Sequence, residues 1–181
     1  MPAGTSVSLS PLLAALTLSR LFGNDFANLP SRYELMLIIS PTASLNHQGT
    51  SKFVDQLNTI VRSRILLVIC LDSLANDSNE LFVYDSPKSA KLSTRDMFIK
   101  KLKSITDVTE KGVITKSADY VSFEHSIYAE KGISAITITT ADQPFTDVYQ
   151  KYSLFDRDFD ARKIAAKIAI IAEALARTLV I

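Results

Sequence analysis

Short continuous apolar runs alternate with helically spaced apolar residues along the chain. The longest such run, ILLVICL at Ile65–Leu71, predicts a strand that is covered on both faces and is therefore central. Similar or shorter runs predict strands at Leu35–Ile39, Leu81–Tyr84, Val113–Thr115 and Ile133–Ile138. Because helical patterns separate these runs, we expect an α/β domain with a mainly parallel, mixed sheet.

Helices are predicted between the strands by apolar residues three and four positions apart. They run from Pro11 through Leu21, from Thr50 through Val61, over Thr94–Lys103, over Ser122–Lys131 and from Asp160 to the chain end. A turn is expected at Gly23–Ser31 after the first helix, and Gly132 is expected to close the fourth. On the last helix, Ile164, Ile168, Ile171, Leu175 and Leu179 form the predicted buried stripe, while Arg162, Lys163, Lys167, Glu173 and Arg177 should face water.

Composition narrows the possible functions without selecting one. The 181 residues are enough for one domain with a sizeable core, and a net charge of +1 gives no electrostatic footprint for nucleic acid. The chain has two histidines, which is a poor supply of ligands for a zinc enzyme. No apolar run reaches the length of a membrane span, and Met1–Leu18 lacks the basic start of a signal peptide.

Asp72 is the first candidate site residue, because it ends the strongest predicted strand. Ligands in open parallel sheets bind beyond the carboxyl ends of the strands. The alternative, favoured from sequence, is a turn residue hydrogen-bonded to the loop Ser73–Asn76.

Glu124 and His125 open a predicted helix and could form an acid–base pair or supply a metal ligand. The favoured interpretation is structural: Glu124 interacts with the helix N-terminus, and His125 hydrogen-bonds within a crowded loop. His47 has no acidic or sulfur neighbour at ligand spacing and is interpreted as a polar loop residue.

The remaining candidates are weak. Cys70, the single cysteine, lies inside an apolar run and is expected to be a small core residue. Lys100, Lys101 and Lys103 are expected on a solvated helix face, and Asn76 begins an N-glycosylation sequon. The residues alone therefore indicate an α/β domain with no identifiable catalytic site.

Four segments in order nevertheless resemble a known family over nearly the whole chain. They are Asn46-His47-Gln48-Gly49-Thr50, Val68–Ser73, Phe123-Glu124-His125 and Ile170–Leu175. The chain resembles the di-zinc aminopeptidase fold and, within it, the nicalins, which are relatives of nicastrin. The resemblance implies a three-layer α/β/α arrangement over residues 1–181 that lacks N-terminal strands, so we expect a fragment with an unpaired sheet edge and a tendency to aggregate.

The resemblance also implies that the zinc site is degenerate. The family's bridging Asp falls on Val7, its Glu-Glu pair falls on Ala43 and Ser44, and a ligand His falls on Tyr152. Asp72 alone is retained among the ligand positions, and with Glu124 and His125 it would form a remnant cleft. Two zinc ions need several carboxylate and imidazole ligands, so we expect a pseudoenzyme with no metal and no cofactor.

A nicalin-like chain would be a luminal scaffold domain of an endoplasmic-reticulum membrane complex, with its anchor outside these residues. The implied partners are the nodal modulator protein, a multi-spanning membrane subunit and the ribosome-associated translocon, with no nucleic-acid contact. Phe145–Phe159, rich in aromatic residues, is the candidate binding surface. A nicastrin-like substrate receptor of an intramembrane protease and a working aminopeptidase-type hydrolase remain the alternatives.

Overall fold

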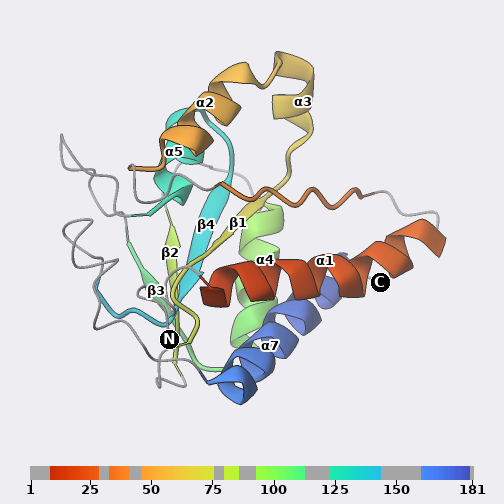
Figure 1. Cartoon of the computed structure of the whole chain (residues 1–181), viewed down its shortest axis with the longest axis vertical. Helices are drawn as coiled ribbons and strands as arrows, with labels where there is room; N and C mark the ends of the chain where they lie inside the picture. The colour runs from red at the N-terminus through yellow and green to blue at the C-terminus, as the bar shows by residue number, and fades with distance from the viewer. Residues whose placement is uncertain are drawn as a thin grey trace.

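Four strands form one mixed sheet, and helices lie on both of its faces (Figure 1). The computed structural model describes residues 9–28, 33–40, 46–75, 80–85, 93–112, 123–143 and 160–179. The strands are β1 (Val68–Leu71), β2 (Leu81–Asp85), β3 (Val108–Lys111) and β4 (Ala135–Thr139). Their order is β1-β4-β2-β3. The β1–β4 and β2–β3 pairs are parallel, and β2 and β4 are antiparallel.

The helices divide between the two faces of the sheet. They are α1 (Ser10–Asn28), α2 (Gln48–Gln56), α3 (Thr59–Arg64), α4 (Thr94–Lys103), α5 (His125–Glu130) and α7 (Ala161–Leu179). Residues of α1, α4 and α7 share the larger hydrophobic cluster, whereas α2 and α5 contribute to a smaller cluster with β1 and β4. The predicted α/β/α arrangement is therefore confirmed.

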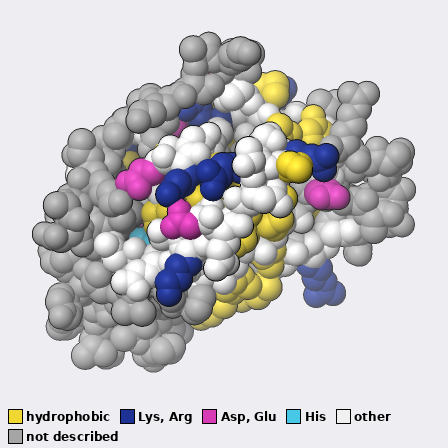
Figure 2. Space-filling view, turned by 90° about the horizontal axis from the view of Figure 1, so that it is seen from above, with side chains coloured by type: hydrophobic (Ala, Val, Ile, Leu, Met, Phe, Trp, Pro, Cys, Tyr) yellow, Lys and Arg dark blue, Asp and Glu magenta, His cyan; other side chains and the backbone are white. Residues whose placement is uncertain are grey.

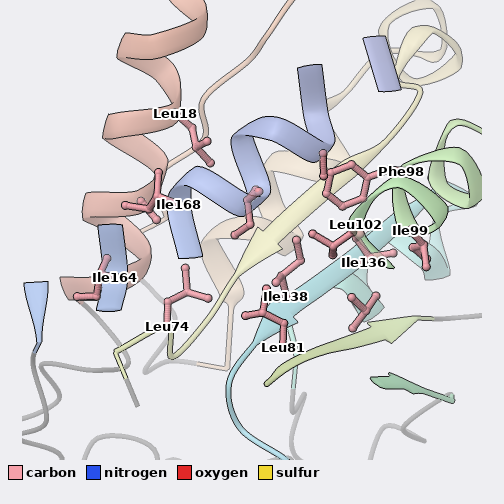
Figure 3. Packing of buried hydrophobic residues seen from close by; sticks show 14 of the residues in the cluster. Leu18, Leu74, Leu81, Phe98, Ile99, Leu102, Ile136, Ile138, Ile164 and Ile168 are labelled. Carbon is pink, nitrogen blue, oxygen red and sulfur yellow. The ribbon is translucent and has the colours of Figure 1, made fainter. Parts of the chain in front are cut away.

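Alternation along β4 explains how one strand serves both faces, because successive side chains of a strand point to opposite sides. Ile136 and Ile138 belong to the larger cluster, and Ala135 belongs to the smaller one. Around the two isoleucines, Phe98 and Leu102 approach from α4, and α7 and α1 close the far side of the cluster (Figure 3).

Two helices begin where the sequence predicts. Ser93 and Asp96 form a capping box at the start of α4, in which each side chain bonds the other residue's backbone N–H. Asp160 accepts a hydrogen bond from the backbone N–H of Arg162 at 2.9 Å at the start of α7. Gly132 has a φ of 74° just after α5, which is the left-handed conformation predicted for a residue that closes a helix.

The strand predicted at residues 35–39 is wrong. These residues have no regular secondary structure, and all five side chains are exposed. A strand needs a hydrogen-bonded neighbour, and the sheet formed by the described residues ends at β1. The prediction that residues 65–71 form a central strand is also wrong for this sheet, because β1 is the outermost strand among the described residues.

Other boundaries also differ. The first helix continues to Asn28 through the predicted turn at Gly23, and the helix expected from Thr50 through Val61 is divided into α2 and α3. Asn58 causes the division, because its side chain accepts a hydrogen bond from the Val61 N–H and starts α3. The prediction at Val113–Thr115 lies outside the described residues, and β3 comes earlier in the chain. Among the described helices, none combines the length and hydrophobicity of a transmembrane segment.

Candidate functional site

Asp72 lies directly after β1, at the end of the sheet where the parallel strands β1 and β4 have their carboxyl ends. Its backbone N–H donates to the Ile138 carbonyl at 3.0 Å, so it continues the pairing of β1 with β4. Its side chain is buried and accepts a hydrogen bond from Ser73 Oγ at 3.2 Å. This contact matches the predicted structural role of a turn residue bonded to its own loop.

The loop after Asp72 is fixed by polar side chains from distant segments. Ser10 Oγ accepts from the Leu74 N–H at 2.9 Å, and Lys167 Nζ donates to the Leu74 carbonyl at 3.0 Å. Thr140 Oγ1 donates to the Ser73 carbonyl. The start of α1, the middle of α7 and the end of β4 therefore converge on one loop.

Lys167 corrects the sequence analysis, which placed it in water. Its residue exposure is 4%, and its ammonium group donates to the Leu74 carbonyl inside the protein. A buried ammonium group loses its hydration and needs such an acceptor. The periodicity of α7 could not show this, since the acceptor belongs to a loop 93 residues away.

Glu124 and His125 are neighbours in sequence, but their side chains bond to different elements. Glu124 accepts a hydrogen bond from Thr50 Oγ1 of α2. His125 Nδ1 lies 2.8 Å from Thr137 Oγ1 of β4, and both of these residues are buried. Glu124 therefore bonds to α2 and His125 bonds to β4, and the two side chains do not act together in one cleft.

Burial sets the chemistry of His125. Desolvation of the charged ring lowers its pKa to about 4, so the imidazole is neutral at neutral pH. The Phe123 ring stacks against the imidazole with ring centroids 6.1 Å apart, and the ring centroids of Tyr84 and Phe123 are 4.4 Å apart. These contacts are those of an internal histidine, but its partner lies on β4 and not in the crowded loop that the structural interpretation named, and Glu124 forms no side-chain cap on α5.

Two residues differ from what the sequence suggested. His47 was interpreted as a polar loop residue, but it is buried in the left-handed conformation before α2. Tyr84 was not singled out. Its hydroxyl donates to the Asp142 carbonyl at 2.6 Å, and burial raises its pKa to about 12. No sequence signal marked this tyrosine, because its acceptor lies 58 residues away.

Cys70 is buried in the smaller cluster, as predicted. Lys100, Lys101 and Lys103 are exposed as predicted, and Lys103 pairs with Glu110. The predicted degenerate zinc positions, the sequon and the candidate binding surface lie outside the described residues. These are Val7, Ala43, Ser44, Asn76, Tyr152 and residues 145–159, of which none is described.

The described residues do not fit a zinc centre. Within the described ranges, no group of three or more His, Cys, Asp or Glu side chains lies close enough together to hold a metal ion. Asp72, Glu124 and His125 instead bond to Ser73, Thr50 and Thr137 respectively.

Sequence comparison finds similarity to nicalin. The chain is 22% identical over 192 residues to the BOS complex subunit NCLN of Rattus norvegicus and 24% identical over 194 residues to that of Homo sapiens. Each match covers 97% of this chain, and nicalin of Caenorhabditis elegans matches 93% of it at 22% identity. The chain spans about a third of the length of these relatives (34%, 34% and 33%). No protein-family model matches the chain.

Structural comparison finds the aminopeptidase fold. An aminopeptidase from Aneurinibacillus sp. strain AM-1 superposes with a TM-score of 0.73 at 16% identity, over 97% of this chain and 40% of that one. BSAP, a zinc aminopeptidase from Bacillus subtilis, gives a TM-score of 0.66 at 17% identity, over 90% of this chain and 39% of that one. The predicted resemblance, an aminopeptidase-like fold with its sequence similarity to nicalin, is confirmed by the two comparisons together.

Proposed function

We propose that the chain is a non-catalytic scaffold domain of an endoplasmic-reticulum membrane protein complex, placed on the luminal side. The observation that carries this proposal is the similarity to nicalin over 97% of the chain, because those relatives are named as subunits of a complex. The partners would be the nodal modulator protein, a multi-spanning membrane subunit and the ribosome-associated translocon.

The side chains near the strand ends support a structural role. Lys167 and Ser10 hold the loop that follows Asp72, and each bonds the backbone of Leu74. His125 is neutral at neutral pH because its pKa is lowered to about 4, and its Nδ1 is engaged by Thr137. Polar groups that are satisfied inside the protein stabilise a rigid body, and a scaffold needs such a body to present a constant surface.

The parent protein should therefore be purified from mild-detergent extracts of its own membranes, and the proteins that accompany it identified. We expect the nodal modulator protein and translocon subunits in stoichiometric amounts. Presenilin-type protease subunits would instead support the nicastrin-like alternative. A parent protein that elutes with no membrane partner would contradict the scaffold proposal.

A hydrolase is the second candidate, and the fold favours it because BSAP is named as a zinc aminopeptidase. We expect no release of p-nitroaniline from leucine p-nitroanilide above the blank after incubation with Zn²⁺, and far less than one zinc ion per chain by elemental analysis. The Asp72→Asn variant should behave identically, and Asp107→Asn is a matched control outside this region. Turnover by the wild type and the control that Asp72→Asn abolishes would establish an enzyme and overturn the non-catalytic assignment.

A further inference from the structure

The helices α2 and α5 are tied to each other at both ends. Near their N-terminal ends, Thr50 of α2 donates a hydrogen bond to the Glu124 carboxylate at the start of α5. At their C-terminal ends, Lys131 Nζ lies 2.7 Å from Asp55 Oδ1. This ion pair is partly exposed and is the weaker tie, whereas Thr50 is fully buried. Because the two ties hold the helices side by side, residues 48–56 and 124–131 form one unit, the α2–α5 layer.

The α2–α5 layer has a small contact with the sheet. α5 packs on β1 and β4, and α2 packs mainly on α5. His125 Nδ1 lies 2.8 Å from Thr137 Oγ1 of β4, and the apolar part of the contact is the smaller cluster. Among the described residues, six are buried in that cluster and 16 in the larger cluster, which holds α1, α4 and α7 on the opposite face. Since burial of apolar surface supplies most of the stabilising free energy, the layer is held less firmly than the opposite face.

The outer side of the α2–α5 layer faces water. Figure 2 shows this end of the molecule from above, and basic and acidic side chains are interspersed on it. Lys52, Asp55 and Lys131 are exposed. Val54 and Ile127, on the inner side of the layer, are buried. Opening of the layer therefore mainly breaks its sheet-facing contacts.

Cys70 lies under the α2–α5 layer. It is the single cysteine of the chain, it is 7% exposed, and it belongs to the smaller cluster. Its register partner on β4 is Thr137, which bonds to His125. A thiol buried in this way is inert toward reagents in water. We propose that α2 and α5 open together as one unit, at a lower free energy than global unfolding, and that this opening uncovers Cys70 while α1, α4 and α7 stay packed on the sheet.

Labelling of Cys70 with a small aromatic disulfide such as dithiodipyridine tests the proposal in the 181-residue protein, at neutral pH and without denaturant. At low reagent concentration the labelling rate is proportional to the population of the open state. We expect Ile127→Ala, which weakens the contact with the sheet, to speed labelling about tenfold or more. Phe98→Ala is the matched control in the larger cluster and should change the rate by less than about threefold. If global unfolding uncovered Cys70 instead, Phe98→Ala would speed labelling about a hundredfold or more.

Hydrogen exchange of the wild type tests the same proposal without a substitution. The slowest amides of α2 and α5 should exchange with one common free energy of opening, and the amides of α4 and α7 should exchange more slowly. Ile127→Ala should speed exchange in α2 by the same factor as in α5, because the two helices open together. The proposal would be overturned by a hundredfold acceleration of labelling in Phe98→Ala or by exchange in α2 that Ile127→Ala leaves unchanged. Exchange of α4 and α7 at the rate of α2 and α5 would also overturn it.

Discussion

Phe98→Ala is expected to lower the free energy of unfolding by about 3–5 kcal/mol, the usual cost of removing a buried aromatic ring. Phe98 is fully buried on α4, within the cluster that also contains Ile136 of β4. Removal of the ring leaves a cavity between the helix and the sheet that rigid neighbours fill only in part. Urea unfolding followed by far-UV circular dichroism measures the change.

The neighbouring residue provides a matched control on the same helix. Met97 is 43% exposed, against 0% for Phe98, so Met97→Ala removes a side chain of similar size from the surface of the same helix. We expect a change within about 0.5 kcal/mol, as is usual for surface substitutions. If Phe98→Ala costs no more than Met97→Ala, α4 does not pack on the sheet as described.

Acidification from pH 6.5 to pH 4 is expected to destabilise the protein through His125. Burial lowers the pKa of this histidine in the folded state to about 4, below its unfolded value of 6.5. Between these values the unfolded chain binds a proton that the folded protein does not bind, so stability falls as the pH falls. The stability contributed by the neutral, buried ring is fully present above pH 6.5 and declines by about 1.4 kcal/mol per pH unit below it. The loss reaches roughly 3 kcal/mol by pH 4.

The difference between the wild type and His125→Gln isolates this contribution, because the carboxylates titrate in both proteins. We expect the unfolding free energy of the wild type to depend more steeply on pH across this window. Thr137→Val is the informative control, since it removes the hydroxyl bonded to Nδ1 but leaves the ring buried. It should cost about 1–3 kcal/mol at neutral pH and keep the steep dependence, because desolvation causes the lowered pKa. Equal pH dependence in the wild type and His125→Gln would refute the assignment.

Local chemistry explains which features the sequence could predict. Three confirmed predictions depend only on neighbours within a few residues or on one apolar run. They are the capping of α7 by Asp160, the closure of α5 by Gly132 and the burial of Cys70. Local signals gave a wrong prediction at the end of the first helix, where a turn signal follows a helical pattern. The part of the turn predicted at Gly23–Ser31 that the structure describes, up to Asn28, is helical, although Gly, Asn and Asp are poor helix formers, and it continues a helix whose Phe22 is anchored in the larger cluster.

The candidate site was predictable only in part. The role of Asp72 as a turn residue was anticipated from its position at the end of a predicted strand, and its bond to Ser73 agrees with that role. His125 was expected to bond within its loop, whereas its partner is Thr137 of β4. Burial of His47 and Lys167 was missed. A side chain's exposure depends on which distant segment covers it, and no periodicity within its own helix or loop contains that information.

The sequence by itself determined the α/β class, the helices and strands with strong periodicity, and the resemblance to nicalin, because these follow from residue order. Only the tertiary structure decided that β1 is the outermost strand of the sheet formed by the described residues, that residues 35–39 have no partner strand among those residues, and that Lys167 reaches the Leu74 carbonyl. The physical reason is that strand order and burial are non-local. A continuous apolar run shows that a segment can be covered on both faces, whereas its actual neighbours depend on the rest of the fold.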